Sequence, residues 1–510
     1  MVVNGIERYI ITGAQAKQDE YRAKTYGRDS TKGAPNIPLI ENIDNYSDIQ
    51  NAETMILQMQ GSYCTEIHMH PYFESRDDIH INKNKLARLQ ALIEIEKDKK
   101  NPDLRKLRGA DYFDKTIGVK NLNDKLAVAD LIVPPQNQNP MTGKLNIPQN
   151  QLNKSVIFAH SKQMLKVAPK GHSGKYPRLL LTTGLITHPN YNETNFRGDK
   201  ARWDHQYGFV VAEIIDSKRY LVRLVPANKN GTFVDMGYKY EAHKKPQRAI
   251  VDTIVLGDIH LRDHDPKSLK ASYEMIDYFQ PKYVVVHDFF NGHSMNPHER
   301  DNTIKRSIQF KKGRLDIYKE YSECFEELVN NLYKKIQKWG GEIIMPFSNH
   351  PFFAHRYLSE GEFLKEPWND TKFVSDIRSQ ALEGYDPIKA GLEIIAKEKN
   401  QNLPEEIHFL DDIEDFKRWG YQLGVHGHKG LNGGRGSFKS MKTDYGKIIM
   451  GHTHTPEVWG DAMCVGTNTN IPLDYNRGQP TTQLPANAII YEGGLAQLLP
   501  IINGVWNTGL

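Results

Sequence analysis

From residue 249 onward the chain alternates short apolar runs with longer amphipathic stretches, and this rhythm restricts it to a few folds. The apolar runs are AIVDTIVLGD (249–258), KYVVVHD (282–288) and GEIIMPF (341–347). Helices are predicted between them, over Ser268–Phe279 and Leu315–Trp339, where apolar residues recur every three to four positions. Strands that alternate with helices form a parallel sheet with helices packed on it. We therefore expect a layered α/β domain that binds its ligands at the carboxyl ends of the strands.

The first half of the chain lacks this alternation. Residues 156–240 contain short β-like runs broken by Gly, Pro and Asn, whereas residues 84–100 have the apolar spacing of a helix. Three polar segments have no periodicity, and we expect an irregular arm at 1–60, a loop or hinge at 134–151 and a linker at 243–248. A chain of 510 residues is too long for one hydrophobic core. The sequence therefore predicts a β-containing α+β region over 1–245, for substrate binding or oligomerisation, and an α/β domain over 246–510.

Composition limits the environment of the protein. The three cysteines, Cys64, Cys324 and Cys464, lie far apart and have no metal-ligand spacing, which favours a reducing compartment without disulfides. No run of about 18 apolar residues is present, and the N-terminus lacks the layout of a signal peptide. We therefore expect a cytoplasmic protein with no membrane partner.

The charge is distributed unevenly between the two halves. Residues 1–250 carry ten more basic than acidic side chains, whereas residues 251–510 carry six more acidic than basic ones. Within the first half, residues 151–200 hold eight basic and two acidic side chains. Such an excess is typical of a surface that neutralises phosphates, although a solvated basic surface without a partner explains it equally well. One hypothesis is that residues 151–200 hold a nucleic-acid backbone.

Acids, asparagine and histidines follow five of the apolar runs. A single histidine at a strand end is more often structural than a ligand, but five strand ends that open on one crevice make chance a poor explanation. In G-D-I-H and G-H-T-H, ligand residues are two positions apart, so both side chains can project to one side of an extended chain. Mixed nitrogen and oxygen donors suit divalent transition ions better than calcium. The residues are Asp258, His260, Asp288, Asn349, His350, His426, His428, His452 and His454.

The order D-x-H, D, N-H, H and G-H-x-H resembles the signature of the calcineurin-like metallophosphoesterase superfamily over about residues 250–500. The resemblance implies a layered β-sandwich flanked by helices and two divalent ions, Mn²⁺ above all, with Mg²⁺, Fe²⁺ or Zn²⁺ as alternatives. It implies that Asp288 bridges the two ions and that His350 acts as the catalytic acid. It assigns Asp258, His260 and His454 to the first ion and Asn349, His426 and His452 to the second.

This chain departs from the superfamily pattern at two positions. His287 precedes the bridging aspartate where the superfamily usually has glycine, and Pro351 follows His350 where it usually has an acid. The fourth motif, YQLGVHGH, leaves a choice of ligand. His426 directly follows the apolar stretch and is preferred, but His428 lies on the same side by period.

Two segments near the ligands are candidates for binding substrate. The glycine-rich stretch 427–437 carries Lys429 and Arg435, so backbone amides and two cations could approach a phosphate there. A flexible rim loop is an equally good explanation. The segment after the bridging aspartate adds His293, His298 and Arg300, which we expect at the edge of the site rather than around a third metal.

The motif fixes the class of reaction and leaves the substrate open. The basic first half favours DNA, and the layout is similar to a group of tailed-phage proteins that degrade DNA early in infection, which would place the protein in the host cytoplasm. The resemblance rests on HGHKGLNGGRGS and RLLLTTG. The sequence therefore predicts a two-metal DNase, with a homo-oligomer left open. The alternatives are a phosphatase or small-molecule phosphodiesterase of the same superfamily and a metal-binding scaffold without catalysis.

Overall fold

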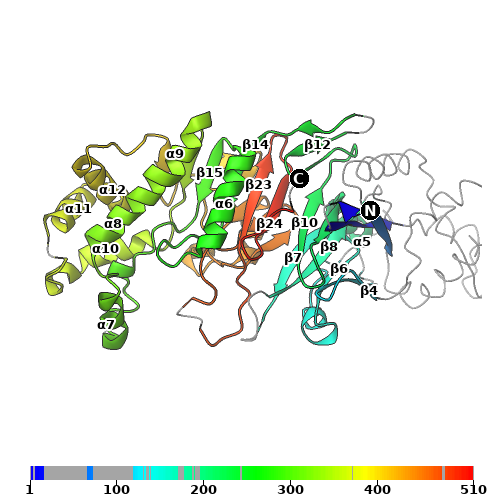
Figure 1. Cartoon of the computed structure of the whole chain (residues 1–510), viewed down its shortest axis with the longest axis horizontal. Helices are drawn as coiled ribbons and strands as arrows, with labels where there is room; N and C mark the ends of the chain where they lie inside the picture. Colours follow the sequence, from blue (N-terminus) through cyan, green and yellow to red (C-terminus); the bar gives the residue numbers. More distant parts are fainter. Residues whose placement is uncertain are drawn as a thin grey trace, which may run out of the picture.

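The computed structural model describes a mixed α/β protein (Figure 1). It describes residues 2–3, 6–15, 66–72, 119–129 and 131–508, the last range with short gaps. The gaps are at 132, 134–136, 138, 171–176, 186–188, 190–195, 242–243, 370 and 474–476. The helix predicted over 84–100 and most of the predicted arm lie outside the described residues.

A six-stranded sheet forms the centre of the second half. Three of its four parallel strands, β14, β15 and β16, lie in the predicted apolar runs, whereas β17 was not predicted, and two antiparallel strands from the end of the chain complete the sheet. The order is β17 (Ile407–Phe409), β16 (Glu342–Met345), β15 (Tyr283–Val286), β14 (Val251–Leu256), β23 (Ala486–Tyr491) and β24 (Ala496–Pro500). The structure therefore confirms the prediction of an α/β architecture with parallel strands for the second half.

Helices cover one face of this sheet because its buried strands alternate between two cores. Ile254 and Val284 point into a core shared with the helices, whereas Val255 and Val285 point into a second core. In Figure 1, α6 crosses the sheet and the remaining large helices gather beyond it. These helices are α6 (Pro266–Phe279), α8 (Ile317–Phe325), α9 (Lys334–Ile336), α10 (Pro351–Ser359), α11 (Lys372–Leu382) and α12 (Pro387–Glu398).

Both long helices of the sequence analysis are present. The stretch predicted over Leu315–Trp339 is nearly continuous, with a π-helical segment (Glu326–Tyr333) after α8 and a 3₁₀ turn (Gln337–Trp339) after α9. The other helices are η1 (Ile147–Gln151), α5 (Phe196–Trp203), η2 (His293–Met295), α7 (Thr303–Lys311), η5 (Glu362–Lys365), η6 (Leu431–Gly433) and α13 (Phe438–Tyr445).

The second core lies between the six-stranded sheet and a ten-stranded sheet to which both halves of the chain contribute. Strand β21 of the second half pairs antiparallel with β7 of the first half, through Val458 with Leu165 and Trp459 with Met164. The ten-stranded sheet therefore contains strands from both sides of residue 245, where the sequence analysis placed the boundary between the two regions. Its order is β18 (Lys417–Arg418), β19 (Tyr421–Gln422), β20 (Ile448–Met450), β22 (Ala462–Cys464), β21 (Glu457–Trp459), β7 (His160–Ala168), β8 (Arg178–Gly184), β6 (Ser155–Phe158), β5 (Leu126–Ala129) and β4 (Val119–Asn121).

Two further sheets involve segments that were predicted to be irregular. The described part of the arm contains β2, which pairs with β9 and β3, and the predicted linker ends in β13, which pairs with β12. The five-stranded sheet contains β1 (Val2–Val3), β2 (Ile6–Gln15), β3 (Glu66–Tyr72), β9 (Gly208–Ile214) and β10 (Tyr220–Pro226). The three-stranded sheet contains β11 (Phe233–Asp235), β12 (Tyr238–Tyr240) and β13 (Gln247–Arg248). Among the described residues, no helix has the length and apolar character needed to cross a membrane.

Candidate metal centre

The predicted ligands lie in loops that leave the ends of strands in the two central sheets. Asp258 and His260 follow β14, Asp288 follows β15, and His452 and His454 follow β20. Four of these five residues have left-handed backbone angles, with φ of +46° at His260, +41° at Asp288, +70° at His452 and +57° at His454. Residues other than glycine seldom adopt this backbone conformation, and those that do are concentrated at functional sites. The backbone therefore turns sharply at the positions that direct the donor atoms inward.

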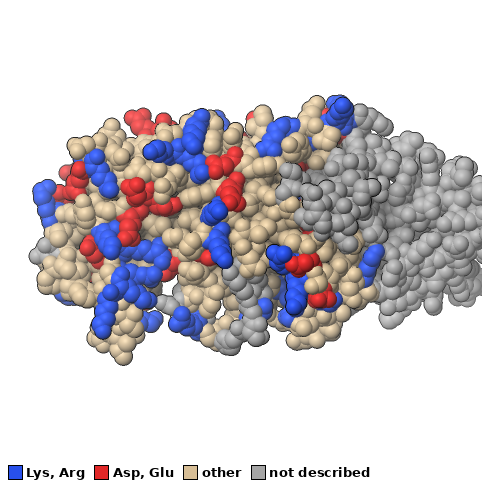
Figure 2. Space-filling model, in the orientation of Figure 1, with Lys and Arg blue, Asp and Glu red and all other residues tan. Residues whose placement is uncertain are grey.

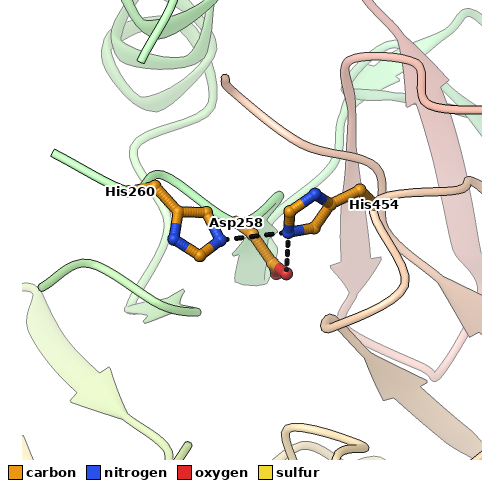
Figure 3. Close-up of side chains that lie close together, drawn as sticks. All are labelled: Asp258, His260 and His454. Atoms are coloured by element: carbon orange, nitrogen blue, oxygen red, sulfur yellow. Dashed lines mark hydrogen bonds and ion pairs between the residues drawn. The ribbon is translucent and has the colours of Figure 1, made fainter. Parts of the chain in front are cut away.

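Asp258, His260 and His454 form one compact group (Figure 3). The Nε2 atoms of the two histidines are 3.0 Å apart, and His454 Nε2 is 3.1 Å from Asp258 Oδ2. The donor atoms of these three residues lie within 4.8 Å of one another, so they could hold one metal ion. A hydrogen bond between Gln483 and His454 Nδ1, 3.1 Å long, fixes the ring so that Nε2 faces the other two residues.

Asp288 is shared by two further groups. One group contains His260 and His350, and the other contains His426 and His452. Asp288 Oδ2 lies 3.0 Å from His426 Nε2, 3.7 Å from His260 Nε2 and 3.8 Å from His350 Nε2. This carboxylate therefore stands between the two sets of histidines.

The ionisation of these groups is the one that metal binding requires. Burial lowers the pKa of His260 to about 3 and that of His452 to about 4, so both rings are neutral and offer a lone pair. Burial alone would raise the pKa of Asp258, but the hydrogen bond from His454 and the charge of His426 bring it down to about 2. The pKa of Asp288 is lowered in the same way, against the effect of burial, by His426 and His350. Asp258 and Asp288 are thus ionised and the rings of His260 and His452 are neutral, whereas Asp288 raises the pKa of His426.

Several buried atoms at this place have no hydrogen-bond partner among the described residues. They include Asp258 Oδ1, Asp288 Oδ1 and the amide oxygen of Asn349. Buried polar atoms are rarely left unpaired in proteins, and each such atom calls for a ligand, a water or an ion. The donor set therefore fits divalent cations.

The choice between His426 and His428 has a geometric basis. His426 is fully buried and lies with Asp288 and His452, whereas His428 belongs to none of the three groups. Both ring nitrogens of His428 are buried without a hydrogen-bond partner among the described residues, and burial lowers its pKa to about 4. The structure thus groups His426 with Asp288 and His452 and leaves His428 outside this group.

His287 was expected only as a replacement for glycine, and the structure gives it a place against the ligands. Its Nδ1 lies 3.3 Å from His426 Nδ1. The space comes from Gly451, where an added Cβ would lie 2.8 Å from His287 Cγ and 2.3 Å from Asp258 Oδ1. Close packing thus requires a glycine at the start of G-H-T-H. This glycine was the one signal in the sequence that a ring as large as that of His287 could lie beside it.

A polar network behind His350 was missed by the sequence analysis. His350 Nδ1 donates a hydrogen bond to the backbone carbonyl of Asn291, which leaves Nε2 directed at the centre. The Asn291 side chain donates to Asp263 over 3.0 Å, and Asp263 also pairs with His293 and Arg314, each over 2.9 Å. His293 is therefore a buried support of this network rather than an edge contact for substrate.

The remaining candidates for substrate binding lie farther out. Lys429 is paired with Asp412 over 2.9 Å and lies over the rings of Phe347 and Phe352. Arg435 is exposed in the same loop. Arg300 is paired with Glu360 and Glu362, and the His298 ring contacts Phe353, which packs against His350. The structure brings none of these side chains into the three ligand groups, which were found among the described residues.

The basic segment 151–200 is largely built into the ten-stranded sheet. Lys162 is buried and pairs with Asp204 over 2.7 Å, and Lys166 pairs with Glu457 over 3.6 Å. Arg178 is hydrogen-bonded to Asn153. Much of the charge in the described part of this segment is therefore already neutralised or hydrogen-bonded within the protein, and its contact with nucleic acid stays a prediction.

Comparison with known proteins gives one informative similarity. The chain is 27% identical over 423 residues to Protein A1 of Escherichia phage T5, and the alignment covers 77% of this chain and 72% of the phage protein. No family model matches the chain, and no solved structure matches it. The similarity to a phage protein agrees with the layout that the sequence analysis compared with tailed-phage proteins.

Proposed function

We propose that this protein is a metal-dependent phosphoesterase that hydrolyses DNA, with two divalent ions held on either side of Asp288. The observation that carries the proposal is the sharing of Asp288 between histidine groups on both sides, with Asp258 closing the first group. Asn349, with its buried unpaired amide oxygen, would complete the second group. Donor sets that share one carboxylate are typical of paired hydrolytic metal ions.

In this proposal the chain positions the reacting groups around the centre. Divalent ions bound there would supply Lewis-acid activation of water and neutralise charge on the phosphoryl group. Asp258 and Asp288, ionised and buried, hold negative charge where those cations would bind. His350 donates through Nδ1 to the Asn291 carbonyl, so a proton on Nε2 can be passed to the leaving oxygen.

Two observations support DNA as the substrate. The chain is similar over most of its length to a bacteriophage protein. A polyanion also needs cations outside a centre that is itself rich in carboxylates, and the first half of the chain has a basic excess. The competing proposal is a phosphatase or small-molecule phosphodiesterase that uses the same centre.

The experiment that tests the proposal compares three substrates with one preparation. We expect the protein to cleave plasmid DNA, to act on a para-nitrophenyl phosphodiester, and to act poorly on the corresponding monoester. EDTA should abolish every activity, and Mn²⁺ should restore it better than Ca²⁺, which prefers shells made only of oxygen ligands. Undiminished activity in a metal-free preparation would exclude the metal-dependent mechanism. Preference for the monoester would favour the phosphatase.

A further inference from the structure

We propose that α7 and the turn after it, residues 303–314, bind the strand that is to be cut, with phosphates on its lysines and an unpaired base on its aromatic side chain. This inference rests on the proposed function, because it assigns a substrate surface to the same metal centre. The basic segment 151–200 was the site favoured by sequence, whereas α7 belongs to the acidic second half.

The charge of this segment differs from that of its surroundings. Residues 303–314 contain five basic side chains and no acidic one, within a half of the chain that carries six excess acidic residues. Lys305, Lys311 and Lys312 are exposed. Lys305 has a long contact with Glu299, at 3.8 Å, and Lys311 and Lys312 have no ion pair with any described residue. These ammonium groups are available to a polyanion.

Exposed apolar side chains stand among these lysines. Phe310 is 56% exposed and meets the ring of Trp368, itself 44% exposed, with centroids 5.3 Å apart. Ile304 is 73% exposed on the same helix. Aromatic rings interleaved with cations are the usual platform for bases of a single strand, because every base has a face that can stack. The surface therefore favours single-stranded nucleic acid over a small phosphoester.

This segment is connected to the proposed catalytic residue. At its end, Arg314 pairs with Asp263 over 2.9 Å, and Asp263 accepts a hydrogen bond from the Asn291 side chain. The Asn291 carbonyl in turn holds His350. Through these contacts the basic turn is fixed to the network that orients the histidine at the metal centre.

The shape of the molecule leaves α7 accessible. In Figure 1, α7 projects from the body below α10, and Figure 2 shows Lys and Arg side chains gathered over that part of the surface. The turn that follows this projection is joined to His350 through the contacts of Arg314, Asp263 and Asn291. The charge of α7 is complementary to a phosphate backbone, and its exposed rings are complementary to bases.

The test is a binding measurement across a salt series with the full-length protein. A labelled single-stranded oligonucleotide is titrated by fluorescence anisotropy, and a gel checks that it is intact afterwards. Replacing Lys305, Lys311 and Lys312 by Ala should weaken binding and reduce the slope of log K against log salt by about 0.7 for each phosphate that the variant no longer neutralises. The same three positions changed to Arg should keep both the affinity and the slope.

A matched control removes the same charge elsewhere. Lys334, Lys338 and Lys397 are exposed on other helices. Their replacement by Ala should leave the affinity and slope of the oligonucleotide close to wild type. An unchanged slope in the α7 variant, or an equal change in the control, would overturn the inference.

A separate variant tests whether a base stacks on Phe310. Phe310→Leu keeps an apolar side chain but removes the stacking ring, and should weaken single-strand binding roughly fivefold to a hundredfold. Tyr385→Leu, at another exposed ring, should not. Equal affinity of wild type and Phe310→Leu would overturn the base contact.

These outcomes separate the inference from the proposed function. If wild type hydrolyses the small phosphodiester but the α7 variants bind DNA as wild type does, only the α7 inference fails. If α7 governs binding and no phosphoester is hydrolysed with any metal, only the proposed function fails.

Discussion

His287 Nδ1 lies 3.3 Å from His426 Nδ1, so the two imidazoles meet through these nitrogens. His426 directs its other nitrogen at Asp288, 3.0 Å away. A hydrogen bond to the distal nitrogen of a metal-binding histidine fixes the orientation of the ring and its tautomer. His287 therefore positions His426 in the proposed centre.

Removal of this contact should weaken metal binding. His287→Ala is expected to lower metal affinity about 10- to 100-fold, the usual effect of removing such a partner. His287→Asn, whose amide can take the place of Nδ1, should recover most of the affinity. Competition with a metal-binding dye measures both variants. Wild-type affinity in His287→Ala would show that the ring merely fills space.

Gly451 should tolerate no side chain. A Cβ there would lie 2.3 Å from Asp258 Oδ1, so Gly451→Ala must displace either this carboxylate or His287. We expect Gly451→Ala to fold and to lose bound metal, as measured by elemental analysis. Gly384→Ala is the matched control, because a Cβ there meets nothing within 4 Å although φ is +92°. Gly451 itself has no positive φ, so backbone strain does not explain its loss of metal, and metal loss from the control as well would mean that the contact at Gly451 is not the cause.

The roles of His350 and Asp288 can be separated by measuring metal content beside turnover. His350→Ala should lower kcat by roughly 10² to 10⁴, the range for general acid-base groups, and keep its metal. Asp288→Ala should lose metal, because this carboxylate belongs to two of the ligand groups. If His350→Ala lost as much metal as Asp288→Ala, the assignment of His350 as the acid would be wrong.

The metal-free protein should lose stability as the pH falls below 6.5. Burial lowers the pKa of His260 to about 3 and that of His287, His428 and His452 to about 4. Between pH 6.5 and about 4 the unfolded chain binds protons that the folded chain does not bind, so acid favours unfolding. Each such histidine contributes up to about 1.4 kcal/mol per pH unit in that window.

One histidine of the centre works in the opposite direction. Burial would lower the pKa of His426, but Asp288 raises it, so its contribution is present below pH 6.5 and is lost as the pH rises through the raised value. Urea unfolding in EDTA at pH 7, 6 and 5 measures the sum. His287→Asn should give a shallower slope than wild type. A free energy of unfolding independent of pH over this window would contradict the prediction.

Three of the parallel strands could be predicted because an apolar run is a local property of the sequence. The strands before Asp258 and Asp288 are rich in Ile, Val and Leu, as is typical of strands buried on both faces. Asp258, His260 and His454, which the resemblance assigns to one ion, lie together in the structure, and their role as ligands stays a prediction. The left-handed angles at His260 and Asp288 were not predictable, because the surrounding fold imposes them against local preference.

Other features depend on residues far apart in sequence. The support that Asn291 and Asp263 give to His350 arises from three loops, and no spacing in the sequence indicates it. The described part of the predicted arm and the end of the predicted linker form strands, because a neighbouring strand offers backbone hydrogen bonds to β2 and β13. Pairing of this kind overrides composition.

The antiparallel pairing of β7 with β21 has a consequence for synthesis of the chain. Leu165 leaves the ribosome about 290 residues before Val458, its partner in the sheet. During that interval the backbone of β7 presents an open edge, and open edges recruit other strands. Newly made chains that are truncated before Val458 should therefore aggregate, and full-length chains should depend on chaperones or slow translation more than a protein with local pairing.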